Sequence, residues 1–330
     1  MHSSNNIGVV VIGRNEGDRL KRCLSSVLNQ NDTIVYVDSG SSDTSVEYAK
    51  SQGFEVIQLD MTIPFSAGRA RNEGFNHLVK KYHQLKYIQF IDGDCELQDG
   101  WLAFGIQFLE INSTCAVVAG RRNERFPEQS IYNLLCDIEW NTPIGKAEAC
   151  GGDFLIRKCA FEEVEGFNPT VVAGEEPELC YRLRKKNWSI FRLDHPMTLH
   201  DAAITRFSQW WKRCVRAGHA YAQGYALHAN DGLGYCSKES LKIWFWALIF
   251  PAFILFLTLS VNITFLLLFS IYLVQFVKIS LQKNKHLGNM AHSAKYSIFI
   301  IIGKFPQLIG QLVFIKRKLS RDKFSIIEYN

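Results

Sequence analysis

The sequence predicts an α/β fold, with a Rossmann-like, mostly parallel sheet covered by helices on both faces, followed by C-terminal membrane helices. Three observations support this fold class. Short apolar runs alternate with amphipathic stretches through the first half of the chain, which is typical of a sheet covered on both faces. Polar clusters follow three of the apolar runs. After about residue 236 the composition becomes strongly apolar.

The individual elements follow from hydrophobic periodicity. The run over 7–12 has the length of a buried strand, and the next stretch carries Leu20, Leu24 and Leu28 at helical spacing. The same alternation recurs along the chain. Strands are predicted over 7–12, 33–37, 54–59, 87–91, 115–119 and 154–157, and helices over 16–29, 43–52, 67–81 and 100–111.

The composition limits the class of protein. A chain of 330 residues with 47% hydrophobic residues suits one large α/β domain plus an appendage. The net charge of +5 comes without a long basic block, so no nucleic acid partner is expected. The nine cysteines form no C-x-x-C pair, which favours free thiols in a reducing compartment over a thiolate zinc site. The first residues do not read as a signal peptide, so we expect the bulk of the chain in the cytoplasm.

Two uncharged apolar runs, 243–259 and 265–277, predict a transmembrane helical hairpin. Each is near the lower length limit for crossing a bilayer, where about 20 residues are typical. Lysines flank the pair on both sides, and the turn between the runs carries no charge. By the positive-inside rule, both ends of the hairpin are expected in the cytoplasm. The alternative is a buried core hairpin in a soluble protein.

A third apolar stretch, 296–315, contains Lys304 and Pro306, which favour a helix lying in the membrane interface over a full span. We therefore expect a catalytic domain over 1–236, a transmembrane hairpin over 237–282, and an interfacial helix with a basic cytoplasmic tail over 283–330.

The strongest chemical signal is the D-G-D sequence at Asp92 and Asp94, just past a predicted strand. Two carboxylates at i and i+2 can bracket a hard cation, and that cation can offset charge on a diphosphate leaving group. A D-x-D alone is often only a turn. Here, two further polar clusters follow predicted strands, and such strand ends converge on one crevice in a parallel sheet. These clusters are Gly13-Arg14-Asn15-Glu16 and the segment 38–43 that begins with Asp38.

Charged residues also open two predicted helices. Arg69 and Arg71 begin one helix, whose positive dipole end favours phosphate. Glu175 and Glu176 begin another. Capping and dipole compensation explain such acids without any catalytic role, whereas neighbouring carboxylates can also raise the pKa of a general base.

These motifs in order resemble glycosyltransferase family 2, with the GT-A fold. The order is V-V-I-x-R-N-E, V-D-S-G-S-S-D, G-x-A-R-N-x-G, D-G-D and G-E-E-x-E-L, and the resemblance covers roughly residues 7–225. It implies inverting transfer from a nucleotide-diphosphate sugar. By position it implies donor binding by Arg14, Asn15, Glu16, Asp38, Arg69, Arg71, Asn72, Gly151 and Gly152, metal binding by Asp92, Asp94 and His200, and base catalysis by Glu176 with Glu175 as a rival.

Two positions depart from the family pattern. Ser39 stands where many members have an aspartate, and Glu176 stands where the base is usually an aspartate. His200 either completes the metal site or only hydrogen-bonds in a loop. The Q-x-x-R-W signature of processive polymer synthases is not present, which favours transfer of a single sugar.

The sequence therefore predicts a metal-dependent glycosyltransferase on the cell membrane, multi-pass, with its catalytic domain on the cytoplasmic face. The expected cofactor is Mn²⁺ or Mg²⁺. The expected partners are a UDP- or GDP-sugar donor, a lipid-linked or saccharide acceptor, and the membrane itself, in surface polysaccharide or glycolipid assembly. The alternatives are a nucleotidyltransferase and a non-catalytic membrane scaffold with a transferase-like fold.

Overall fold

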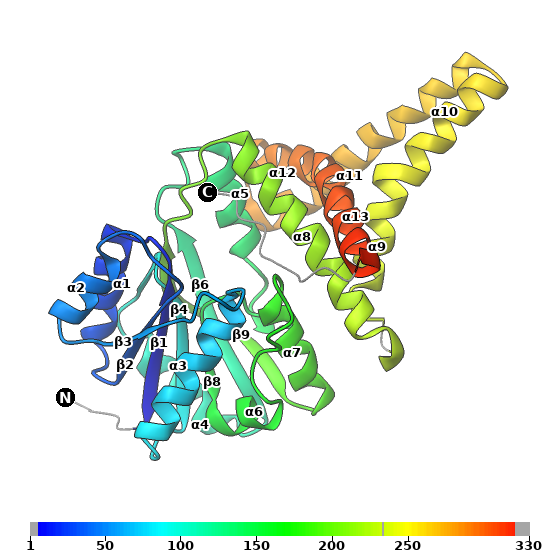
Figure 1. Cartoon of the computed structure of the whole chain (residues 1–330). Coiled ribbons are helices and arrows are strands. Elements are labelled where there is room, and N and C mark those ends of the chain that lie inside the picture. The colour runs from blue at the N-terminus through cyan, green and yellow to red at the C-terminus, as the bar shows by residue number, and fades with distance from the viewer. Residues whose placement is uncertain (1–5, 233, 321–330) are drawn as a thin grey trace. The chain divides into compact units, whose positions relative to one another are not determined.

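The computed structural model describes residues 6–232 and 234–320 (Figure 1). Contacts along the chain divide it into two compact units, Met1–Ala203 and Ile204–Asn330. The division falls before helix α8 (Phe207–Leu227), so this helix belongs to the second unit, whereas a catalytic domain reaching residue 236 was expected. The predicted basic residues Arg321 and Lys323 of the tail lie outside the described residues.

The first unit is built on one sheet, with nine strands among the described residues, in the order β3-β2-β1-β4-β8-β6-β9-β5, with β7 also paired to β9. The strands β3, β2, β1 and β4 are mutually parallel. In β1, Val9, Val10 and Val11 are completely buried, as expected for a central strand covered on both faces. The strands are β1 (Ile7–Gly13), β2 (Ile34–Asp38), β3 (Glu55–Gln58), β4 (Tyr87–Asp92), β5 (Cys95–Leu97), β6 (Cys115–Glu124), β7 (Gly145–Lys146), β8 (Phe154–Arg157) and β9 (Ser189–His200).

Beyond β4 the sheet is mixed rather than parallel. Strand β8 lies antiparallel to both β4 and β6, while β6 pairs with β9 in parallel. The strands β5, β7 and β9 were not predicted, and β6 continues five residues past the expected end at Ala119, to Glu124. These strands carry charged residues and bulges, so their apolar pattern is weak.

The predicted helices of the first unit are all present, within one or two residues at most ends. Helix α3 packs on β1 and β2, and α4 packs on β6 and β8 (Figure 1). Gly74 of α3 permits a very close approach, because a Cβ there would lie 2.4 Å from a methyl carbon of Val10. The helices are α1 (Asp18–Leu28), α2 (Ser45–Ser51), α3 (Ala67–Lys81), α4 (Trp101–Ile111), α5 (Ile131–Trp140), α6 (Lys158–Glu163) and α7 (Glu175–Lys185).

The second unit is helical in its described residues. Three helical stretches, Ser237–Ser260, Ile263–Leu287 and Met290–Ser320, are long and apolar enough to cross a membrane. Only 17% and 6% of the apolar windows in the first two are buried, which favours the predicted transmembrane hairpin over a buried core hairpin. The elements are α8, η1 (Ala229–Asp231), α9 (Ser237–Trp244), η2 (Phe245–Ile249), α10 (Phe250–Ser260), η3 (Ile263–Phe269), α11 (Ser270–Leu287), α12 (Met290–Ile302) and α13 (Lys304–Ser320).

The predicted hairpin is present as the stretch through α10 and its return through α11 (Figure 1). The Tyr272 hydroxyl donates a hydrogen bond to the Trp246 carbonyl across it. The third apolar stretch, expected to lie in the interface, has the length of a span, although α12 and α13 meet at Gly303, next to Lys304.

Helices α8 and α13 cross with their backbones in contact. A Cβ at Gly218 would lie 1.9 Å from the Gln307 carbonyl oxygen, and one at Gly310 would lie 1.9 Å from the Val215 carbonyl oxygen. Small residues at such crossings are typical of helices that associate in membranes, where close packing supplies much of the attraction.

Candidate active site

The predicted polar clusters meet at one edge of the sheet. In the parallel ladder, Ile12 of β1 pairs with Asp92 of β4, and Gly13 pairs with Asp38 of β2. The segments that follow these strands therefore leave the sheet side by side at its carboxyl edge, where α/β proteins bind ligands.

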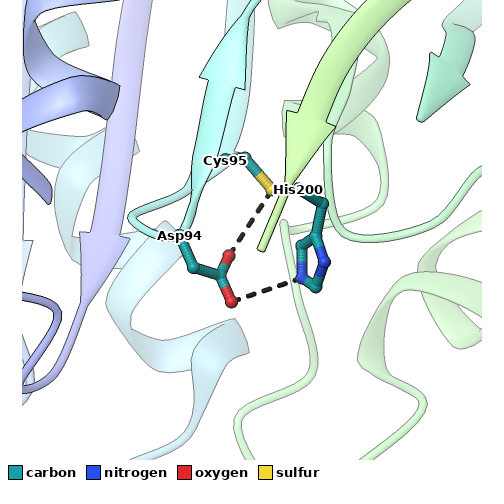
Figure 2. Close-up of side chains that lie close together, drawn as sticks. All are labelled: Asp94, Cys95 and His200. Carbon is teal, nitrogen blue, oxygen red and sulfur yellow. Dashed lines mark hydrogen bonds and ion pairs between the residues drawn. The ribbon is translucent and has the colours of Figure 1, made fainter. Parts of the chain in front are cut away.

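Asp94 and His200 are brought together at this edge by two short strand ends (Figure 2). Cys95 of β5 pairs with His200 at the end of β9, so the residue before β5 lies beside the imidazole. His200 Nε2 is 3.3 Å from Asp94 Oδ2, and its Nδ1 is 3.2 Å from Glu124 Oε2. The ring also packs edge-on against Trp140. His200 therefore lies at a strand end between two carboxylates, and not in a loop with a single hydrogen bond.

The charges in this pair reinforce each other. Burial raises the pKa of Asp94, but His200, together with Arg122 and Arg19, outweighs burial and holds that pKa below its usual range. Burial lowers the pKa of His200, but Asp94 and then Glu124 reverse this and raise it to about 9. Without a cation the imidazole is therefore protonated near neutral pH, and a metal ion would take the place of that proton.

Cys95 lies close to the same pair but does not suit a hard cation. Its Sγ is 3.5 Å from Asp94 Oδ1, and the ligand atoms of Asp94, Cys95 and His200 lie within 4.8 Å of one another. Burial, with Asp153 nearby, raises the pKa of the Cys95 thiol well above its ordinary value. The thiol stays protonated, and oxygen and imidazole ligands suit Mn²⁺ or Mg²⁺ better than sulfur.

Asp92 lies between two arginines. Arg71 Nη2 is 2.6 Å from Asp92 Oδ1, and Arg122 Nη2 is 3.3 Å from Asp92 Oδ2. Arg71 is almost completely buried and also pairs with Glu175 at 3.0 Å. Burial raises the pKa of Asp92, and the arginines oppose this. The D-x-D motif therefore has two different halves, because one aspartate faces an imidazole and the other faces guanidinium groups.

The predicted loop at Gly151 and Gly152 passes directly over Asp92. A Cβ at Gly152 would lie 2.7 Å from Asp92 Oδ2 and 3.0 Å from Arg71 Nη2, so a side chain there would displace the carboxylate. Asp153, which follows, is completely buried and accepts hydrogen bonds from the Asp92 backbone N–H at 2.9 Å and from Arg122. It fixes the position of both groups.

Glu16 adds a further carboxylate to this edge. Burial, and next the charge of Asp94, raise its pKa to about 7, although Arg19 lies 2.7 Å away and lowers it. A cation bound here would offset the repulsion between Glu16 and Asp94, and it would therefore favour the ionised form of Glu16.

Asp38 and Asn15 shape the neighbouring loop. Asp38 is completely buried and accepts bonds from the Gly40 and Ser41 N–H groups and from the Tyr36 hydroxyl, all at 2.9 Å. Asn15 accepts a bond from the Ser42 N–H at 2.7 Å. These bonds tie the loop after β2 to the segment that follows β1.

Three other predicted donor residues bind neighbouring backbone or an aromatic ring. The Arg69 guanidinium donates to the carbonyls of Asp60 and Ile63, both at 3.0 Å. The Asn72 amide exchanges two hydrogen bonds with the backbone of Phe167. The guanidinium carbon of Arg14 lies 4.7 Å from the centre of the Phe65 ring. Arg71, in contrast, lies at the D-x-D, where it contacts Asp92.

Glu175 and Glu176 at the start of α7 have different surroundings. Glu175 pairs with Arg71, as described above. Glu176 Oε1 accepts hydrogen bonds from the Cys150 N–H at 2.6 Å and from the thiols of Cys150 at 3.0 Å and Cys180 at 2.9 Å. Within the described residues, every side-chain hydrogen bond of Glu176 ends on Oε1 and none ends on Oε2.

Three residues that complete the site were not predicted from the sequence: Arg122, Glu124 and Cys150. Arg122 and Glu124 lie in the part of β6 that was not predicted to be strand. The charged run Arg121-Arg122-Asn123-Glu124, directly after a predicted strand, was the available signal, like the polar clusters that were used.

Residues 8–162 match the sequence model described as glycosyl transferase family 2. This first unit is a family 2 glycosyltransferase domain. Its fold is GT-A, in agreement with the prediction. The family match favours a glycosyltransferase over the alternative of a nucleotidyltransferase.

Two curated relatives support the family. The chain is 31% identical to the uncharacterized glycosyltransferase YibD of Escherichia coli K12 over 102 residues, which is 29% of this chain and 28% of YibD. It is 21% identical to the glycosyltransferase AglE of Haloferax volcanii over 251 residues, which is 72% of this chain and 79% of AglE. The match thus spans less than a third of YibD but most of AglE.

Among solved structures, the mannosyltransferase PcManGT of Pyrobaculum calidifontis, in complex with GDP-Man and Mn²⁺, has a similar fold. The TM-score is 0.58 at 15% sequence identity, and the match covers 89% of this chain and 86% of that one. At this identity the likeness concerns the fold.

Proposed function

We propose that this glycosyltransferase transfers one sugar, with inversion, from a nucleotide-diphosphate sugar to a hydroxyl of a lipid-linked or saccharide acceptor. The observation that supports it most is the pairing of Asp94 with His200 beside Asp92, at the carboxyl edge of the sheet of a family 2 domain. The donor is a UDP- or GDP-sugar, and PcManGT, which shares the fold, was solved with GDP-Man and Mn²⁺.

Asp94 and His200, with Asp92 next to them, would hold the metal. The residues fit such an ion, because a carboxylate oxygen and an imidazole nitrogen, both suitable ligands for Mn²⁺, already lie 3.3 Å apart. When bound, Mn²⁺ or Mg²⁺ supplies positive charge that offsets the charge of the departing diphosphate. Arg71 and Arg122 would add fixed charge on the other side of Asp92.

The loops after β1 and β2 would bind the nucleoside, with Asn15, Glu16 and the Asp38 loop at the base and ribose. Asp38 would act through the loop that it shapes, because its oxygens are already hydrogen-bonded. Gly152 would let the donor sugar approach Asp92, since any side chain there would fill that space. Three residues, Arg69, Asn72 and Arg14, would stabilise the loops on the donor side through their contacts with backbone and Phe65.

Glu176 would be the general base. With Oε1 fixed by Cys150 and Cys180, Oε2 can take the proton of the acceptor hydroxyl as that oxygen attacks the anomeric carbon opposite the leaving diphosphate. Glu175 is the rival, although its pairing with Arg71 makes it a better positioning group.

The apolar helices would fix the protein in the membrane with the catalytic unit on the cytoplasmic face, where surface polysaccharides or glycolipids begin their assembly. Lys238 and Lys242 precede the hairpin and Lys283 and Lys285 follow it, which favours cytoplasmic ends. Residue 320 would lie outside the cytoplasm if Met290–Ser320 spans the membrane, and on the cytoplasmic side if it lies in the interface. Labelling single cysteines placed at 262 and 289 in sealed vesicles tests this topology, and labelling of 289 from outside would refute it.

The function is tested on the detergent-purified full chain. Thermal stabilisation by a panel of nucleotide-sugars, with and without Mn²⁺, identifies the donor, because a ligand that binds the folded state raises the melting temperature. Metal-dependent release of the nucleotide and retention or inversion at the anomeric carbon of the product are then measured by NMR. Failure of every nucleotide-sugar to bind in the presence of metal would overturn the proposal.

A further inference from the structure

The second unit contains a pocket of its own, between α8, α9 and α13. Its volume is about 720 Å³, within the range of about 300–1,000 Å³ that is typical of small-ligand sites. The walls are largely apolar, formed by Ala222, Ala226, Leu241, Trp244, Phe314 and Ile315. Such a lining suits a hydrocarbon chain.

Two buried polar groups line the same pocket without a partner. Gln311 is 2% exposed and Ser240 is 9% exposed, and within the described residues neither Gln311 Nε2 nor Ser240 Oγ makes a hydrogen bond. A buried donor without a partner is costly, by about 1–3 kcal/mol. Both groups can donate a hydrogen bond, and Lys318 adds a cation to the lining, which holds no carboxylate among the described residues. The polar part of the pocket therefore suits an anionic, oxygen-rich group.

The helices around the pocket indicate a lipid as its ligand. Leu241 and Trp244 belong to the helical stretch Ser237–Ser260, and Gln311 and Phe314 belong to Met290–Ser320, both apolar enough to cross a membrane. With these helices in a membrane, a molecule that enters between them would come from the bilayer. An apolar wall combined with donors and one cation matches a lipid phosphate, whose chain and head need these two environments.

We propose that this pocket binds the phosphate-bearing lipid part of the acceptor, with the phosphate at Gln311, Ser240 and Lys318 and the chain along α8 and α13. The assignment of this lipid as the acceptor rests on the proposed function, whereas lipid binding by the second unit does not. The pocket is separate from the residues that hold the donor, all of which belong to the first unit.

The test is photo-crosslinking of the full chain in detergent with a single-chain alkyl phosphate that carries a diazirine near its head. We expect labelled peptides from α8, α9 and α13, and protection by excess unlabelled alkyl phosphate. Gln311→Leu, which keeps the volume nearly unchanged, should weaken labelling about tenfold or more, the effect expected for a lost hydrogen bond to a charged group. Ala226→Trp, which fills the pocket, should abolish it. Leu312→Ala, an exposed neighbour on α13 outside the lining, is the matched control and should label like the wild type.

The outcomes separate this proposal from the proposed function. Asp94→Asn should still be labelled, so binding here is measured without turnover. Labelling that is unaffected by Gln311→Leu and Ala226→Trp overturns the pocket, even if donor binding is confirmed. Equal protection by the alcohol without phosphate, or by diacyl phosphatidylglycerol, overturns the choice of ligand. Crosslinks from a diazirine residue placed at 226 to residues 321–330 in place of lipid would assign the pocket to the chain itself.

Discussion

His200 Nε2 lies 3.3 Å from Asp94 Oδ2, although Asp94 precedes β5 and His200 ends β9, far apart in the chain. The antiparallel pairing of β5 with the end of β9 creates this contact, and Glu124 fixes the other side of the imidazole. The pair is the part of the site that can be tested most directly.

Asp94→Asn should reduce metal-dependent turnover by about 100-fold or more, because the charged metal ligand is lost while the shape is kept. Its melting temperature should fall slightly, because His200 loses one carboxylate partner but keeps Glu124. Asp92→Asn should lose turnover as well but should also destabilise the chain by about 1–3 kcal/mol, since Arg71 and Arg122 lose a charged partner. Nucleotide release with varied Mn²⁺ and thermal unfolding measure both effects, and full turnover in both variants would remove the metal assignment.

Glu176→Gln should lower kcat by about 100-fold or more with donor binding little changed, as expected for loss of a general base. Glu175→Gln should change the binding of the donor more than kcat, because Glu175 orients Arg71. Steady-state kinetics with the identified donor and acceptor separate the two. A larger fall in kcat for Glu175→Gln would move the base by one residue.

Glu55 provides a pH-dependent contribution to stability. Burial raises its pKa, but hydrogen bonds from His77, Lys81 and Tyr82 outweigh burial and lower it to about 2, from 4.5. Because the folded-state pKa is the lower one, the stabilisation is complete above about pH 4.5 and is lost as the pH falls towards 2. The side chain is partly exposed, so solvent screening limits the effect to about 1 kcal/mol.

Glu55→Gln should therefore lower the melting temperature at about pH 7 and 5, with a smaller difference at about pH 3.5. Glu73→Gln, an exposed carboxylate on α3, is the control and should show no such trend. A difference that grows on acidification would contradict the ion-pair explanation.

Gly310→Val should destabilise the second unit by about 3 kcal/mol, at the upper end for an overpacked contact. The added side chain would press on the backbone of Val215 and separate α8 from α13. Ile309→Val, at the preceding, exposed position, should be nearly neutral. Thermal unfolding and yield of the full chain in detergent measure the difference, and an unchanged melting temperature in Gly310→Val would show that the crossing is not tight.

Much of the secondary structure of this protein could be predicted from local sequence patterns. The strand Ile7–Gly13 and the helix Ala67–Lys81 were predicted almost to the residue, because buried parallel strands and amphipathic helices have periodic signals of their own. The D-G-D at the end of β4 and the apolar runs of the hairpin are local as well.

Tertiary structure decided which side chains meet. The contact of Asp94 with His200 depends on the register of β5 on β9, and that of Asp92 with Arg122 depends on β8 entering the sheet antiparallel between β4 and β6. The pocket around Gln311 depends on the crossing of α8 with α13. Strand register, strand order and helix crossing are set by contacts between residues far apart in the chain, and hydrophobic periodicity within a single segment carries no information about them.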